Sequence, residues 1–152
     1  LPDGGASGKY FTGWFFKDGS VDGDWGTEAA FPLVGDGIET TVTVYSRWSD
    51  EAREDGSCKE FAFILTDEAK TFTLSNGVYV FRYDYKKTEF GFLSLQCSLE
   101  ALDFAYIFSV EDTTGKTYHP NGIFVNSPTT LYFTVVISDM EQTCDWEFFI
   151  SQ

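Results

Sequence analysis

The chain has 152 residues, and its 24 acidic and 10 basic side chains give a formal net charge of −14 at pH 7. A surface this negative repels a phosphate backbone and an anionic membrane, which excludes nucleic acid and lipid headgroups as expected partners. The hydrophobic content of 43% is enough for one buried core. No apolar run reaches the roughly 20 residues of a membrane-spanning helix. We therefore expect one domain over residues 9–152, preceded by a flexible N-terminal segment over residues 1–8.

The chain begins with Leu1 and contains a single methionine. This is consistent with removal of a leader peptide or with a piece of a longer chain, and the first option predicts a secreted, extracellular protein. In an oxidising compartment we expect one disulfide among Cys58, Cys97 and Cys144, with Cys58 and Cys144 favoured because each precedes a similar strand. The alternative is three buried, reduced cysteines.

The first strand signal lies in residues 8–16, GKYFTGWFF, and an acidic turn follows over residues 17–28. In this turn, alternating oxygen-bearing side chains and a glycine reproduce the first half of an EF-hand-type calcium loop. The second half departs from that pattern, because Ala29 stands at position twelve. We expect either a Ca²⁺ site or a metal-free acidic turn. The candidate metal ligands are Asp18, Ser20, Asp22 and Asp24.

Two tryptophans lie where predicted strands run into loops. Trp25 is in the acidic turn, and Trp48 ends the next strand signal, TVTVYSRW, over residues 41–48. Exposed indole rings at such positions would offer flat apolar platforms for stacking on sugar rings. Alternatively, both tryptophans close the ends of the core.

The rest of the chain alternates apolar and polar residues with the period of two that strands require. Residues 61–80 and 104–125 are similar in sequence, and Asn76-Gly77 is typical of a tight hairpin. The first block therefore predicts a four-strand meander, and the second block repeats it. The predicted strands cover residues 61–65, 70–75, 78–83, 88–97, 104–110, 116–119, 123–125, 130–138 and 144–151.

These short strands predict an all-β fold, a single antiparallel β-sandwich built from hairpin meanders. A repeat period of about 43 residues is also compatible with a three-fold pseudo-repeat of trefoil type. A closed up-and-down β-barrel is the third option, and it would enclose a ligand cavity.

Aromatic residues make up 18% of the chain, and we expect most of the rings in the core. The rings assigned to the core are Phe61, Phe63, Phe72, Phe90, Phe92, Phe104, Phe108 and Phe133. In the strand over residues 78–83, Tyr79 and Tyr83 share one face and Arg82 lies on the other. Such a strand is either central or lines a pocket. In a pocket, Arg82 would need a carboxylate partner and would orient an anionic ligand; otherwise it extends to the sheet edge.

Three functions are compatible with this pattern. The first is a secreted module that binds a glycan or another neutral small molecule, with or without Ca²⁺. The second is a β-barrel that binds a small molecule, or a cyclase or isomerase, in a cavity lined by Tyr79, Arg82 and Tyr83. The third is a structural or host-interaction protein that self-associates through sheet edges. With His119 as the only histidine, the sequence favours a binding protein over an enzyme.

Overall fold

The computed structural model describes residues 8–31, 41–97, 104–141 and 143–152. The chain divides into two compact units, Leu1–Arg53 and Glu54–Gln152, and each is described by itself. The single domain predicted over residues 9–152 stays a prediction, and the predicted flexible segment lies outside the described residues apart from Gly8. In this part of the chain, no helix is long and apolar enough to cross a membrane.

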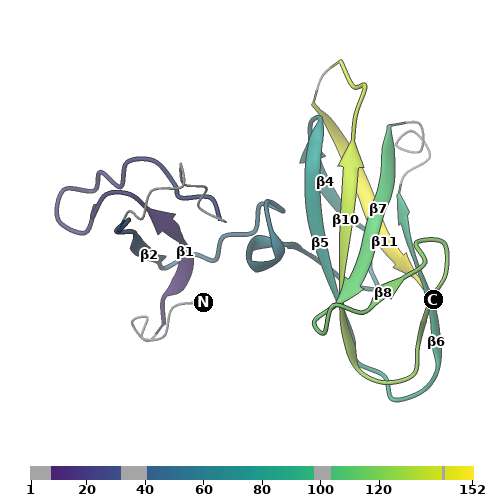
Figure 1. Cartoon of the computed structure of the whole chain (residues 1–152). Coiled ribbons are helices and arrows are strands. Elements are labelled where there is room, and N and C mark those ends of the chain that lie inside the picture. The colour runs from purple at the N-terminus through teal and green to yellow at the C-terminus, as the bar shows by residue number, and fades with distance from the viewer. Residues whose placement is uncertain (1–7, 32–40, 98–103, 142) are drawn as a thin grey trace. The chain divides into compact units, whose positions relative to one another are not determined.

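The described residues confirm the all-β class, because they form eleven strands and a single short 3₁₀ helix (Figure 1). The first unit contains β1 (Tyr10–Phe15) and β2 (Tyr45–Ser49), which pair antiparallel with a bulge between Phe11 and Gly13. The elements of the second unit are η1 (Lys59–Phe61), β3 (Phe63–Leu65), β4 (Lys70–Leu74), β5 (Gly77–Tyr85), β6 (Gly91–Cys97), β7 (Ala105–Asp112), β8 (Thr117–Tyr118), β9 (Ile123–Val125), β10 (Thr129–Ile137) and β11 (Cys144–Ser151).

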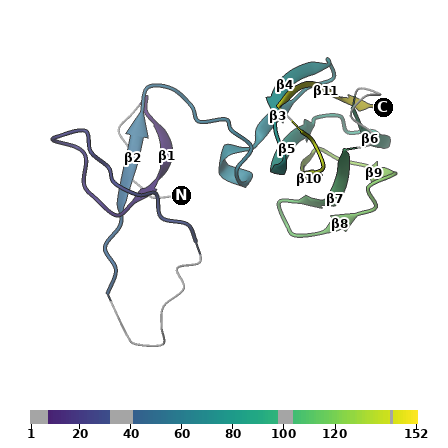
Figure 2. The ribbon, with the colours of Figure 1, turned by 90° about the horizontal axis from the view of Figure 1, so that it is seen from above.

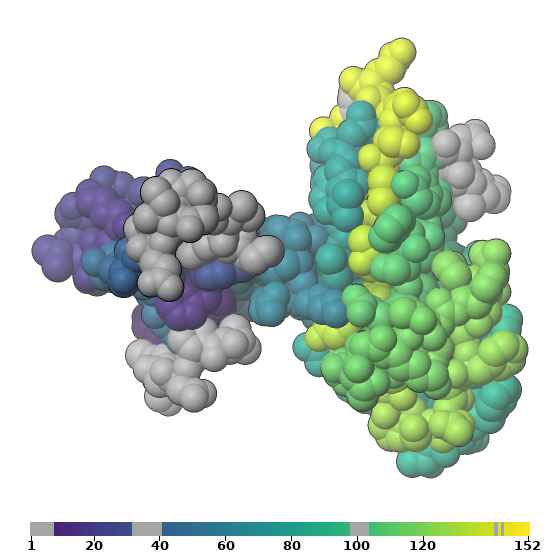
Figure 3. Space-filling view, viewed as in Figure 1, coloured from purple at the N-terminus to yellow at the C-terminus, as the bar shows by residue number. Residues whose placement is uncertain are grey.

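The second unit is a β-sandwich, and Figure 2 shows its two layers end on. One sheet has five strands in the order β3-β5-β10-β7-β8, and the other has four in the order β4-β11-β6-β9. Figure 3 shows the yellow atoms of β10 between teal β5 and green β7, which are far from it in sequence. Neighbouring strands are antiparallel, except that β3 and β5 are parallel. The predicted sandwich is therefore confirmed.

The strands of the sandwich pair as one nested ribbon. The β7–β8 pair is innermost, and β6 with β9, β5 with β10 and β4 with β11 pair around it. Successive pairs alternate between the two sheets, which is the strand order of an eight-stranded jelly roll, with β3 added beside β5. The ribbon thus closes at the turn between β7 and β8.

Three parts of the sequence-based topology are wrong. Asn76-Gly77 does not close a hairpin, because β4 and β5 belong to different sheets and the chain crosses the sandwich between them. The similar blocks over residues 61–80 and 104–125 do not form repeats, since β4 and β8 occupy different sheets, so neither meanders nor a trefoil results. Among the described strands, both sheets of the sandwich have open edges instead of closing into a barrel.

Aromatic rings from the two sheets interlock in the core. The Phe81 ring of β5 lies 5.2 Å from that of Phe72 in β4 and 4.7 Å from that of Phe148 in β11, centroid to centroid. In β10 every second side chain is buried, from Leu131 to Ile137, as the period of two predicts. The remaining face of each strand is left to solvent or to a partner.

Removing the central ring should weaken this core selectively. Phe81 is 0% exposed, so we expect Phe81→Ala to lower the free energy of unfolding of the second unit by about 3–5 kcal/mol, through lost burial and a residual cavity. Phe108→Ala is the matched control, because that ring is 69% exposed, and it should change the value by less than about 0.5 kcal/mol. Urea unfolding followed by circular dichroism measures both. Equal losses would contradict this account of the core.

Candidate functional site

Two exposed phenylalanine rings pack on a third at the β6–β9 edge of the four-stranded sheet. Phe92 in β6 pairs in register with Phe124 in β9, and their ring centroids are 4.9 Å apart. Phe90, just before β6, lies 5.7 Å from Phe124. The exposed fractions are 66% for Phe90, 46% for Phe92 and 57% for Phe124. We call these three residues the ring platform.

The rings point outward because their neighbours in the strands point inward. Leu93 follows Phe92 and Ile123 precedes Phe124, and both are 0% exposed. Successive side chains of a strand face opposite sides, so the two rings must lie on the solvent side of the sheet. Gly122 makes room for one of them, since a Cβ there would lie 2.9 Å from the Phe92 ring.

The sequence analysis assigned eight phenylalanines to the core, and this assignment is wrong for four of them. Phe90 and Phe92 belong to the ring platform, and Phe104 and Phe108 are also exposed. The assignment is correct for Phe61, Phe72 and Phe133, which are buried, and Phe63 packs against the core as a half-buried ring.

A pocket of about 650 Å³ adjoins the ring platform, and the platform residue Phe124 also lines this pocket. It lies at one end of the sandwich, between the end of β5, the β7–β8 turn and the β9–β10 loop; we call it the end pocket. Its walls carry mainly hydroxyl, amide and charged groups, together with the apolar residues Tyr85, Phe124, Val125 and Pro128. The polar side chains that line it are Arg82, Asp84, Lys86, Asp112, Thr113, Thr114, Lys116, Tyr118, Asn126, Ser127, Thr129 and Thr130.

One wall of the end pocket is held by an ion pair. Arg82 donates to Asp84 through Nε at 3.0 Å and through Nη2 at 3.1 Å, and Thr130 Oγ1 donates to the same carboxylate at 2.7 Å. Burial opposes ionisation of Asp84, but the hydrogen bonds from Arg82 and Thr130 lower its pKa. The structure thus supplies the carboxylate partner that the sequence predicted for Arg82.

The other wall is held by Asp112, a carboxylate that is only 7% exposed. Its Oδ1 accepts from the Thr114 backbone N–H at 2.8 Å, from Thr114 Oγ1 at 2.6 Å and from the Lys116 backbone N–H at 3.1 Å. Its Oδ2 accepts from the Tyr118 hydroxyl at 3.0 Å. The hydrogen bond from the Thr114 hydroxyl is the main cause that lowers the pKa of Asp112 to about 2. Asp112 therefore fixes the turn on which the nested ribbon closes.

The two candidate tryptophans lie on opposite faces of the β1–β2 sheet. Trp25 packs on Phe15, with ring centroids 5.8 Å apart, and on the Arg47 guanidinium. Trp48 packs edge-on against Phe11, and its Nε1 donates to Ser46 Oγ at 3.1 Å. Arg47 and Trp48 are adjacent in β2 and so face opposite sides. The structure does not bring the two indole rings together into one platform.

The three candidate residues of β5 also separate. Tyr79 and Tyr83 face the core, whereas Arg82 faces the other way and lines the end pocket. The Tyr79 hydroxyl donates to the Ser75 carbonyl at 3.1 Å. The Tyr83 hydroxyl donates to Asp67, and burial together with this bond raises its pKa to about 12. Tyr83 and its partner Asp67 line a different, smaller pocket of about 230 Å³.

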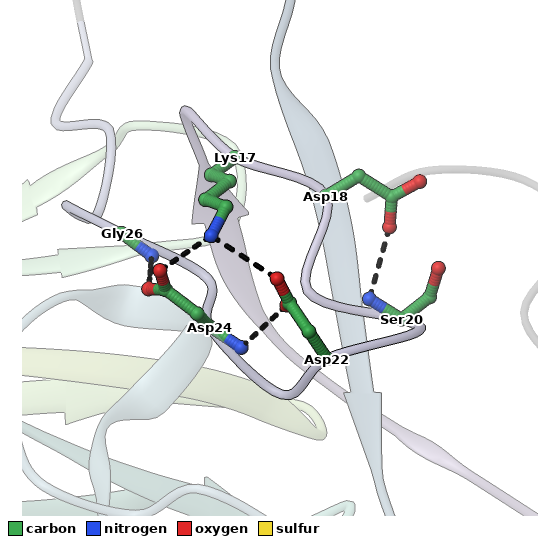
Figure 4. Close-up of polar contacts among 6 residues, drawn as sticks. All are labelled: Lys17, Asp18, Ser20, Asp22, Asp24 and Gly26. Carbon is green, nitrogen blue, oxygen red and sulfur yellow. Dashed lines mark hydrogen bonds and ion pairs between the residues drawn. The ribbon is translucent and has the colours of Figure 1, made fainter.

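In the acidic turn, a lysine lies between the candidate calcium ligands (Figure 4). Lys17 Nζ contacts Asp24 and lies 3.2 Å from Asp22 Oδ2. The other oxygens of this turn accept backbone N–H groups: Asp18 from Ser20 at 3.0 Å, and Asp22 from Asp24 at 2.9 Å. The contacts with Asp24 and Asp22 raise the pKa of Lys17.

Two further observations concern metal ligands and thiols. Across the described ranges, no group of three or more His, Cys, Asp or Glu side chains converges as metal ligands would. The thiols of Cys58 and Cys97 are free, and burial raises the pKa of each. Any disulfide among the three cysteines needs at least one of these two, so the predicted disulfide is not formed in this structure.

Comparisons of the chain with protein-family models, with curated proteins and with solved structures found no match.

The sequence contains a signal for the outward position of the platform rings. In residues 91–97, GFLSLQC, two leucines alternate with Ser94 and Gln96. Phe92 is in step with the two polar residues, so the alternation alone places its ring on the solvent side. The end pocket carries no such signal. Its walls come from three segments that only the nested pairing brings together, and Arg82 was the single wall residue that the sequence indicated.

The bonds to Asp112 predict a specific dependence of stability on pH. Its folded-state pKa of about 2 is below the ordinary 3.8, so the carboxylate stabilises the fold fully above pH 3.8 and loses that contribution as the pH falls toward 2. We expect Asp112→Asn to be less stable than the wild type near neutral pH, with the difference shrinking below about pH 4.

Urea midpoints at about pH 7, 4 and 2.5 measure this difference. Glu68→Gln, which replaces an exposed carboxylate in the same unit, is the control and should show little difference near neutral pH. A deficit of Asp112→Asn that stays constant across the pH range would contradict the assignment.

Proposed function

We propose that the sandwich is the binding module of a secreted protein and that it recognises a glycan on the ring platform. The observation that carries this proposal is the contact of three exposed phenylalanine rings beside a pocket lined by hydroxyl and amide groups. Contiguous apolar surface left open on a folded domain is typical of an interaction site. Because a sugar ring has an apolar C–H face and a polar rim, it matches a surface of this composition.

Polar groups also continue along the same face of the sheet. Ser94 and Gln96 lie on the Phe92 side of β6, and Gln96 Nε2 donates to Ser94 Oγ at 2.8 Å. A short hydroxyl and an amide next to aromatic rings offer both donors and acceptors to sugar hydroxyls. A glycan chain lying along β6 would meet rings and hydrogen-bonding groups in succession.

The chemistry of the end pocket favours binding over catalysis. Asp84 and Asp112 are hydrogen-bonded, and their pKa values are lowered, which suits a structural carboxylate and not a general acid at neutral pH. His119 is not among the residues that line this pocket. A binding module remains the function that these groups support best.

Removing a platform ring should reduce glycan affinity without unfolding the protein. We expect Phe92→Ala and Phe124→Ala each to weaken binding by about tenfold, because each removes one of the contacting rings. Phe108→Ala is the matched control, since it removes an exposed ring from the other sheet. Isothermal titration against neutral and acidic oligosaccharides measures the effect, and urea unfolding checks the fold. The proposal fails if Phe108→Ala weakens binding as much as the platform variants.

Assistance by Ca²⁺ in the acidic turn is a separate part of the proposal. The ion would bind the carboxylates that Lys17 now contacts, so Lys17→Gln should increase the rise in melting temperature that Ca²⁺ produces. Thermal melts in Ca²⁺ and in chelator test this for the wild type and for Lys17→Gln. Melting temperatures that are the same in both conditions for both proteins would exclude a calcium site here.

A further inference from the structure

The end pocket has an excess of basic residues in a strongly acidic protein. Three of the chain's ten basic residues line it, against two of its 24 acidic residues. Arg82 and Asp84 neutralise one another as an ion pair. The charges that remain are those of Asp112, Lys86 and Lys116, so the pocket has a net charge of about +1 while the whole chain has −14.

Neither lysine of the pocket forms an ion pair with a carboxylate in the part of the chain that the structure describes, although Lys86 lies near enough to Asp84 to help lower the pKa of that carboxyl. Lys59 and Lys70 of the same unit, by contrast, each contact a glutamate, at 2.9 Å in both cases. The Lys116 ammonium lies 4.7 Å from the centroid of the Tyr118 ring, which holds it at the pocket without neutralising it. Two ammonium groups are thus available to an oxyanion.

The hydrogen-bonding groups of the pocket that remain free also favour a ligand that carries hydrogen-bond acceptors. Asp112 already accepts four hydrogen bonds, and Asp84 accepts three. Arg82 uses only Nε and Nη2 toward Asp84, and its Nη1 forms no hydrogen bond with the residues that the structure describes. The carboxylates are occupied while donors remain free, so a ligand with negatively charged oxygens fits better than a cation.

From these observations we infer that the end pocket binds an oxyanion carried by a sugar ring, with Lys86 and Lys116 as its charge partners and Phe124 beneath the ring. This inference rests on the proposed glycan function, because Phe124 belongs to both the ring platform and the pocket. The shared chemistry is that of an acidic sugar, whose anionic group is either the carboxylate of a uronic acid or a sulfate ester.

The negative charge elsewhere on the chain does not prevent this binding. At physiological ionic strength, charges farther apart than about 8 Å are largely screened from one another, so the groups of the pocket dominate for a bound ligand. Distant repulsion acts mainly on the rate of encounter, whereas the local contacts determine how long the ligand stays.

Methyl esterification provides a matched probe, because it removes the charge of a uronic acid and keeps its ring. We expect the full chain to bind an oligogalacturonate about fivefold or more tighter than its methyl ester in isothermal titration. The affinity for a sulfated galactose oligosaccharide, compared with that for its unsulfated form, shows whether the bound anionic group is a sulfate ester instead of a carboxylate.

The lysine variants assign that preference to the pocket. Lys86→Gln and Lys116→Gln should each reduce affinity for the anionic form by up to about fivefold and leave affinity for the uncharged form unchanged. Lys87→Gln is the matched control: it is the next residue along the chain and contacts Gln152, but it lines only the smaller pocket, whereas Lys86 lines both. It should keep the full preference for the anion.

The outcomes separate the inference from the proposed function. Equal binding of charged and uncharged forms, with loss of both in Phe92→Ala, would overturn the inference and leave the glycan proposal standing. A preference for the anion that survives in both Lys86→Gln and Lys116→Gln would place the anion outside the end pocket and overturn the inference. Absence of binding to every oligosaccharide, charged or not, would overturn the proposed function and the inference with it.

Discussion

Every second side chain of the sandwich packs between its two sheets, and this constraint determines what the outer faces can do. In β6 and β9 the aliphatic Leu93 and Ile123 fill the core, so the aromatic rings next to them cannot reach it. A phenylalanine that stays largely in water gains less folding stability than a buried one. The three rings of the platform are therefore the surface that we propose for binding, and the same alternation that builds the core also places Phe92 and Phe124 on the outer face.

The closing turn of the nested ribbon links the fold to the site. Asp112 fixes the β7–β8 turn through four hydrogen bonds, and that turn forms one wall of the end pocket. The Arg82–Asp84 pair forms another wall at the end of β5. Because both carboxylates accept hydrogen bonds from the protein's own donors, the walls stay in place, and our proposal assigns Lys86 and Lys116 to a ligand. The same few groups therefore stabilise the fold and shape the pocket that we propose for binding.

The sequence was sufficient for the strands and insufficient for their pairing. Local alternation predicted β9 and β11 with the bounds that the structure shows, because periodicity is a property of neighbouring residues. Pairing depends on contacts between segments that are distant in the sequence. Asn76-Gly77 predicted a hairpin, but the same turn-forming pair also suits a chain crossing from one sheet to the other. Trp25 and Trp48 were singled out as individual residues, and their opposite faces follow only from the β1–β2 register. Arg82 was correct as a residue with a carboxylate partner, but its neighbours in the pocket come from distant segments.

The most direct measurement of the central claim is a map of the ligand's contacts on the whole protein. Titrating the ¹⁵N-labelled chain with an acidic oligosaccharide should shift the amide signals of β6, of β9 and of residues 112–118 and 126–130 that line the end pocket. Signals of β3, of residues 105–110 in β7 and of the β1–β2 sheet should stay in place. Shifts confined to β1 and β2, around Trp25 and Trp48, or to Tyr106 and Phe108 in β7, would contradict the account.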